Sequence, residues 1–151
     1  MGTARRITPE VVEELKAIQR FLETRHSDEP AALAAVLAEV NVQMARTGFL
    51  QAEAQADLDE AMADVFAENK NAILKMPATV STKFIGALCK DEGYYLKWIE
   101  RMNRACTHHA ENLRSLLSYA KESSRVSRYA DNVMSGQDEF PDEQEDDFYG
   151  R

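Results

Sequence analysis

The chain has 151 residues, of which 44% are hydrophobic and 29% charged, with only 6 glycines and 4 prolines. These values are typical of one ordered domain and exclude a low-complexity chain. No apolar run approaches the roughly 20 residues that span a bilayer, and no apolar signal core follows the N-terminus, so we expect a cytoplasmic protein without a membrane segment. Cys89 and Cys106 lack a CxxC partner, which favours two reduced packing residues over a disulfide framework or a zinc site.

The net charge of −8 is distributed unevenly along the chain. Residues 1–69 carry 6 Lys/Arg against 13 Asp/Glu, residues 70–128 carry 11 against 5, and residues 129–151 carry 1 against 8. One basic segment of net charge +6 therefore lies between two acidic segments of net charge −7 each. Such asymmetry is informative about partners, and it predicts a surface for polyanions on the basic segment.

The first predicted helix covers residues 9–25. Thr8 is a suitable N-cap, and Pro9 fits the first turn, where its missing N–H is not needed. Val11, Leu15, Ile18 and Leu22 then step by threes and fours, which places them on one packing face.

A second, long helix is predicted over residues 29–75, with Gly48 as its one expected kink. At 1.5 Å per residue it is about 70 Å long, which exceeds a compact bundle. Its middle is rich in alanine and buries little area, so we expect support from neighbouring chains in a homo-oligomer. The spacing of a coiled-coil seam is kept by Leu33, Leu37, Val40, Met44, Ala54, Leu58, Ala61 and Val65.

Met76 and Pro77 end this rod, and a third helix is predicted over residues 82–124. Thr79, Ser81 or Thr82 is suited to cap this helix. Alternatively, residues 79–82 form a short extended stretch. Gly93 is a possible point at which the helix divides into a short and a long one. Trp98 falls on the seam side as a buried anchor, and His109 is a polar seam residue able to fix the register. The predicted seam consists of Leu88, Tyr95, Ile99, Met102, Cys106, His109, Leu113, Leu116 and Ala120.

The chain is therefore predicted to be all-α, an elongated helical hairpin or open coiled-coil-like bundle, with a single helical domain over residues 1–128. Residues 129–151 are predicted to be an acidic, disordered tail punctuated by aromatic residues. Three roles for this tail stay open. It folds back on the basic segment and competes with nucleic acid, it is a peptide for a protein partner, or it keeps an oligomer soluble.

A basic stripe is predicted on the last helix. Lys90, Lys97, Arg101, Arg104 and His108 fall within about 60° of one another, opposite the seam, over about 27 Å. Arg114 and Lys121, with Arg125 and Arg128, extend the positive charge around the flank. Two interpretations stay open: a track for a phosphate backbone, or a solvated outer face.

An acidic row on the long second helix offers a third interpretation, which is self-assembly. The row lies about 90° from that helix's seam, where salt bridges between helices belong. Its members are Glu53, Asp57, Glu60, Asp64 and Glu68.

No catalytic or cofactor motif is recognisable, and we expect no enzyme and no cofactor. The sequence lacks a Gly-rich phosphate loop, a nucleophile elbow and the Glu-x-x-His pattern of di-metal bundles. His108 and His109 are adjacent on a helix and point about 100° apart, so they do not readily share a metal ion.

The stretch from Tyr95 to Arg104, followed by His108 and by residues 113–122, resembles the C-terminal helix of small helical proteins in phage replication and recombination cassettes. Over residues 30–125 the arrangement of helices is similar to that of UvsY-type recombination mediators. The resemblance implies a homo-oligomer that binds single-stranded DNA in a bacterial host cell and helps to load a recombinase over a single-strand-binding protein. Lys97, Arg101, Arg104 and Arg114 would then contact phosphates.

The function predicted from the sequence is thus a nucleic-acid-binding accessory factor without base specificity, in phage-type recombination or replication. The alternative is a protein-interaction or assembly protein, such as a virion component, a chaperone or an inhibitor of a host defence enzyme, that acts through its acidic surfaces.

Overall fold

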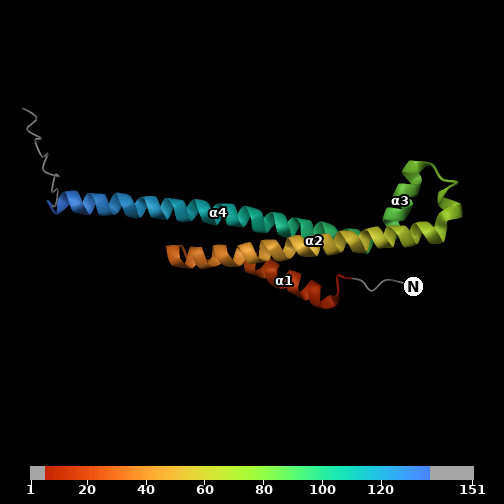
Figure 1. Cartoon of the computed structure of the whole chain (residues 1–151), viewed down its shortest axis with the longest axis horizontal. Helices are drawn as coiled ribbons and strands as arrows, with labels where there is room; N and C mark the ends of the chain where they lie inside the picture. The colour runs from red at the N-terminus through yellow and green to blue at the C-terminus, as the bar shows by residue number, and fades with distance from the viewer. Residues whose placement is uncertain (1–5, 137–151) are drawn as a thin grey trace, which may run out of the picture.

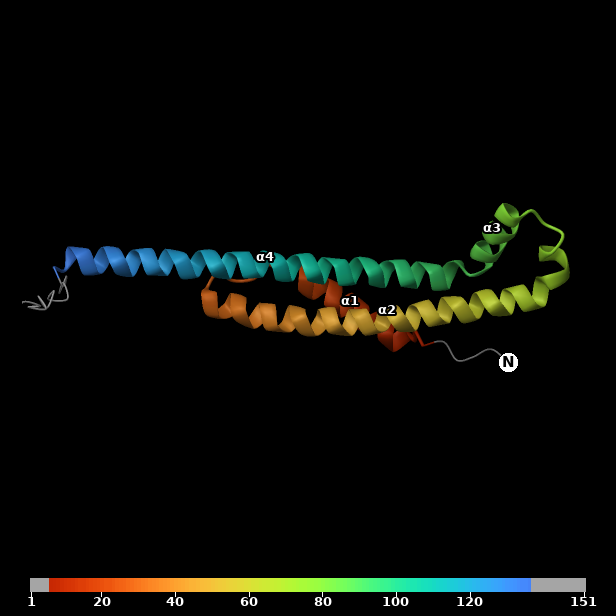
Figure 2. The same cartoon turned by 45° about the horizontal axis from the view of Figure 1, so that its top comes forward.

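The structure is a computed structural model that describes residues 6–136, and within that range it contains four helices and no strand. They are α1 (Pro9–Glu23), α2 (Pro30–Ile73), α3 (Ala78–Leu88) and α4 (Lys90–Met134). Helices α2 and α4 form a long antiparallel hairpin, α1 packs along one side of it, and α3 lies at the tip (Figures 1 and 2). The prediction of an elongated all-α hairpin is confirmed. Among residues 6–136, no helix combines the length and the apolar character that a bilayer crossing requires.

The predicted helix over residues 82–124 is divided into a short and a long helix, as expected, but the place of the division and the outer bounds were wrong. Cys89, with φ −102° and ψ 28°, separates α3 from α4, whereas Gly93 is helical. A glycine inside a helix costs only about 1 kcal/mol, which the packing of α4 overrides. The cap and the extended alternative are also wrong, since α3 begins at Ala78 and the hydroxyls of Ser81 and Thr82 donate to the Ala78 carbonyl within its first turn.

The predicted kink at Gly48 is wrong as well. Thr47 and Leu50 on either side of Gly48 are buried, so packing against α4 keeps this stretch helical. The backbone of α2 leaves helical geometry at Asn69 instead, with φ −110° and ψ 15°. The Asn69 amide donates to the Val65 carbonyl at 3.0 Å and so competes with the helical backbone bond.

Helix α4 continues to Met134, so the predicted start of the tail at residue 129 is wrong. Residues 129–134 contain no Gly or Pro, and the helix is followed by Gly136 in the left-handed region, with φ 67°. Residues 137–151 lie outside the described residues, and so does the prediction of disorder made for them.

The core has two hydrophobic clusters along the hairpin. The first joins α1, α2 and α4 around Val40 and Cys106, and the second includes Ile7, Leu50 and Ile99. Trp98 is half-buried and packs against both clusters, as its predicted anchoring role requires. Both cysteines are free and buried, which confirms the prediction made for them.

The predicted seams are confirmed in the middle of the hairpin and wrong at the ends of α3 and α4. Val40, Ile99 and Cys106 are fully buried, whereas Leu88 and Leu116 are 54% and 49% exposed. Leu88 belongs to α3, which leaves the axis of α4 (Figure 2). Leu116 lies beside the seam, because Leu117 and not Leu116 follows Leu113 in packing on the core.

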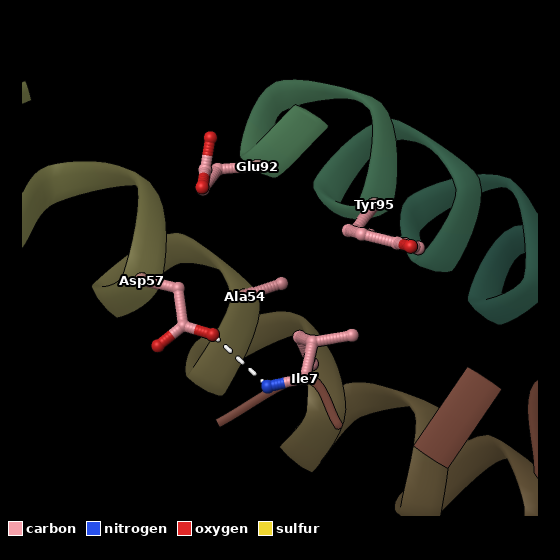
Figure 3. Close-up of a pocket in the computed structure, with 5 residues that line it drawn as sticks. All are labelled: Ile7, Ala54, Asp57, Glu92 and Tyr95. Atoms are coloured by element: carbon pink, nitrogen blue, oxygen red, sulfur yellow. Dashed lines mark hydrogen bonds between the residues drawn. The ribbon is translucent and has the colours of Figure 1, made fainter. Parts of the chain in front are cut away.

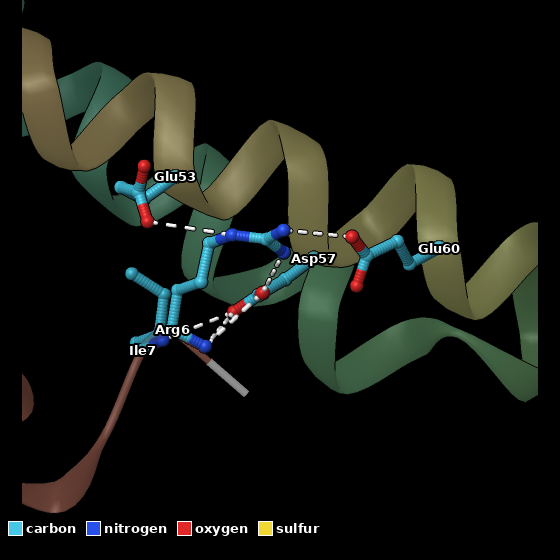
Figure 4. A network of polar contacts seen from close by, with 5 residues as sticks. All are labelled: Arg6, Ile7, Glu53, Asp57 and Glu60. Carbon is cyan, nitrogen blue, oxygen red and sulfur yellow. Dashed lines mark hydrogen bonds and ion pairs between the residues drawn. The ribbon is translucent and has the colours of Figure 1, made fainter. Parts of the chain in front are cut away.

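The acidic row of α2 binds the chain's own N-terminal segment (Figure 4). The backbone N–H groups of Arg6 and Ile7 donate to the Asp57 carboxylate at 2.8 and 3.0 Å. The Arg6 guanidinium lies 2.9 Å from Asp57, 2.7 Å from Glu60 and 3.4 Å from Glu53. Three members of the row are therefore used within the chain, which corrects their predicted role in contacts between chains. We call this network the Arg6 clamp.

The register of α2 against α4 is set by Asn103, whose amide donates to the Met44 carbonyl at 2.9 Å and to the Thr47 hydroxyl at 3.0 Å. His109, predicted for this role, lies against His26 of the α1–α2 connection, with ring centroids 5.9 Å apart. The Nε2 atoms of both rings are buried without a hydrogen-bond partner in the described part of the chain.

We predict that Asp57→Ala lowers the free energy of unfolding by about 2 kcal/mol, because it leaves the N–H groups of Arg6 and Ile7 without their acceptor. Burial raises the pKa of Asp57, but the backbone N–H groups and the guanidinium outweigh it and hold the pKa below its usual value. The stabilisation is thus present above about pH 4 and is lost as the pH falls further. Urea unfolding of Asp57→Ala and of the exposed control Asp64→Ala measures it, and equal losses would contradict it.

We also predict that stability falls between pH 7.5 and 5.5 because of His109. Burial, followed by the nearby His26, lowers the pKa of His109, so the unfolded chain takes up this proton near pH 6.5 before the folded chain does. His109→Leu should flatten this part of the pH profile, and His108→Leu at the exposed neighbouring position should leave it unchanged. The measurement is the urea midpoint against pH, and an unchanged slope in His109→Leu would refute the assignment.

Candidate nucleic-acid interface

All of the predicted site residues lie on α4, and all are exposed to solvent: Lys90, Lys97, Arg101, Arg104, His108, Arg114 and Lys121. Because α4 is one continuous helix from Lys90 onward, the residues predicted to share one helical face do form a row along it. The row from Lys90 to His108, which we call the basic stripe, is on the side of α4 opposite the buried residues Ile99 and Cys106.

The cations at the centre of the basic stripe are available for a ligand. Within residues 6–136, Lys97, Arg101 and Arg104 make no ion pair, although His108 lies 3.4 Å from Glu111. In the Arg6 clamp, by contrast, a guanidinium is held by three carboxylates. The positive charge at the centre of the basic stripe is therefore not compensated by carboxylates of the described residues.

Arg114 and Lys121 do not join this row. At 100° per residue they lie more than about 100° around the helix from the centre of the basic stripe. Arg114 is turned toward α2, where its Nη2 donates to Asn41 at 3.3 Å. By the same helical phase Lys121 lies on a different side of α4 from the basic stripe, so the predicted flank is a separate patch and not a continuation of the stripe.

A polar groove of about 360 Å³ runs beside the basic stripe, between α2 and α4. It is lined by Gln51 of α2 and by Glu100, Asn103, Arg104, Thr107 and His108 of α4. The Gln51 amide is a donor for phosphate or sugar oxygens, whereas the Asn103 amide and the Thr107 hydroxyl already donate to groups of the chain. Glu100 repels anions from part of the groove. Gln51, Asn103 and Thr107 were not predicted, because their convergence depends on the register between two helices that are far apart in sequence.

An exposed aromatic ring lies within the row of cations. Tyr94 is 63% exposed, and by helical phase it falls beside Lys97 and Arg101. Its ring centroid lies 5.7 Å from that of Tyr95 and 6.3 Å from that of Trp98. The half-buried neighbours hold Tyr94 in place and leave it free to stack on a base, as single-strand binders require.

The enclosed pocket beneath the Arg6 clamp is not a ligand site (Figure 3). It holds about 10 Å³ and is lined by Ile7, Ala54, Asp57, Glu92 and Tyr95. That volume accommodates about one water molecule at most. Among residues 6–136, no group of three or more His, Cys, Asp or Glu side chains is arranged to hold a metal ion.

No protein-family model matches this sequence, and the comparisons with curated proteins and with solved structures also gave no match.

Proposed function

We propose that the protein binds single-stranded nucleic acid without base specificity, as a homo-oligomeric accessory factor of phage-type recombination or replication. The observation that carries this proposal is the basic stripe, in which Lys97, Arg101 and Arg104 are exposed and form no ion pair within the described residues. Phosphate binding needs spaced cations of this kind and no base-reading geometry.

The preference for single strands rests on Tyr94. A ring exposed among phosphate-binding cations stacks on an unpaired base but cannot reach a base inside a duplex. In the groove beside Arg104, the Gln51 amide adds a neutral donor for the sugar-phosphate backbone. In this mechanism the protein holds a strand in an open conformation, and no side chain acts as a catalyst.

The small size of the site is our reason for including oligomerisation in the proposal. The basic stripe is about 27 Å long and offers few phosphate contacts, so one chain binds a strand weakly. Several chains on one strand multiply the contacts and bind with higher avidity. The further role in recombination, with a recombinase or a single-strand-binding protein as partner, is an inference from the resemblance to UvsY-type mediators.

A second candidate is a protein-interaction or assembly protein that acts through the acidic part of α2. One observation favours it: Asp64 and Glu68 are exposed on one face of α2 and form no ion pair within the described residues. Acidic side chains without a cationic partner are suited to a basic protein partner, and this candidate predicts no binding of nucleic acid.

The test is fluorescence anisotropy with labelled single- and double-stranded oligonucleotides over a range of salt concentrations. Arg101→Glu combined with Arg104→Glu should weaken single-strand binding at least tenfold and reduce the slope of log K against log salt by about 1.4, at about 0.7 per phosphate contact. The matched control, Arg20→Glu on α1 with Arg25→Glu in the connection that follows α1, should bind as the unaltered protein does. Tyr94→Ala should weaken single-strand binding by about 1–3 kcal/mol and leave duplex binding unchanged.

No binding at low salt would refute the proposal and favour the protein-interaction candidate. Equal losses in the α1 control would show that net charge, and not the basic stripe, governs binding.

A further inference from the structure

The tip of the hairpin carries positive charge without any negative charge. Residues 69–90 include four lysines and no Asp or Glu. Every one of these lysines is exposed, and none forms an ion pair within residues 6–136. They are Lys70, Lys75, Lys83 and Lys90.

The same region exposes large apolar side chains. Leu74 is 67% exposed, Val80 48% and Leu88 54%, and no residue of α3 is buried. In both views α3 stands at the end of the hairpin, away from the core clusters (Figures 1 and 2). We call residues 69–90 the hairpin tip. Its combination of exposed lysines and apolar side chains is suited to a ligand that is both acidic and apolar.

The chain itself contains a segment of that chemistry. Residues 137–151 carry seven Asp or Glu against a single Arg, and they include Phe140, Phe148 and Tyr149. The net charge of −6 in this segment complements the charge of +4 on the hairpin tip, and its aromatic rings complement the exposed leucines and valine.

Geometry excludes contact between the two segments within one chain. Helix α4 has 45 residues, so about 67 Å separates its two ends. The 15 residues 137–151 follow its far end and span at most about 50 Å when fully extended. A contact with the hairpin tip must therefore be made with a different copy of the chain.

We propose that the hairpin tip binds the acidic aromatic segment 137–151 of a second copy of this chain. The contact joins the tip of one copy to the tail of another, so it generates open chains, closed rings or a dimer in which two copies exchange the contact reciprocally. The far end of α4 is a poorer site for the acidic segment, because residues 118–136 carry three cationic side chains against two acidic ones. One of these cations, Arg125, lies 3.4 Å from Glu122 and is already paired. This proposal does not depend on the binding of nucleic acid.

The first test is the mass of the full-length protein by analytical ultracentrifugation. A tip variant combines Lys75→Glu and Lys83→Glu, both at exposed positions. A tail variant combines Glu143→Gln, Glu145→Gln, Asp146→Asn and Asp147→Asn. Each variant alone should lose the higher assemblies, and an equimolar mixture should form only a dimer, because one intact tip meets one intact tail.

The second test measures the contact directly. A labelled synthetic peptide of residues 137–151 is titrated with the tail variant, whose own tails do not compete. Adding Lys75→Glu and Lys83→Glu should weaken peptide binding at least tenfold, and rising salt should weaken it further. The matched control, Lys121→Glu with Arg128→Glu on α4, should leave peptide binding unchanged.

Three results would overturn the proposal. The first is an unchanged mass in both variants, and the second is loss of peptide binding in the α4 control in place of the tip variant. The third is binding of the tail variant to phosphatidylserine vesicles without binding to the peptide, which would make the hairpin tip a membrane-surface site.

Discussion

The seam between α2 and α4 is the constraint on which the rest of the structure depends. Two helices of 44 and 45 residues bury one face of each against the other, with Val40, Ile99 and Cys106 at its fully buried centre. Small side chains such as Ala54 and Ala110 allow close approach along this seam. Isolated helices gain little stability in water, so this burial stabilises both helices and determines which side of α4 faces solvent.

Charge is then sorted by position on the rods. On α2, carboxylates near the seam form ion pairs with Arg6, and these ion pairs attach the N-terminal segment to the helix. On α4, the cations lie opposite the seam, and within the described residues the three central ones have no carboxylate partner. The same antiparallel packing therefore produces a partly neutralised acidic patch on one helix and an available basic stripe on the other.

An elongated shape also separates functions by distance. The hairpin tip lies at one end of the molecule, the basic stripe runs along α4 from that end, and the acidic aromatic segment follows the other end of α4. The binding of a strand and head-to-tail assembly thus use neighbouring surfaces that share only Lys90. Copies joined tip to tail would present successive basic stripes to one strand, which links assembly to avidity without new contacts.

The sequence by itself determined the helical class, the long hairpin and the basic stripe, because these follow from the periodicity of residues within one helix. The spacing of Lys97, Arg101 and Arg104 by four and three residues is an example. Only the tertiary structure decided the rest. Asp57 looks like any member of a surface row, and it becomes buried because Arg6 packs onto it from 51 residues away. Gly48 stays helical through packing on α4, and the groove at Gln51 and Asn103 depends on the register. Contacts between distant residues determine these features, and no local pattern encodes them.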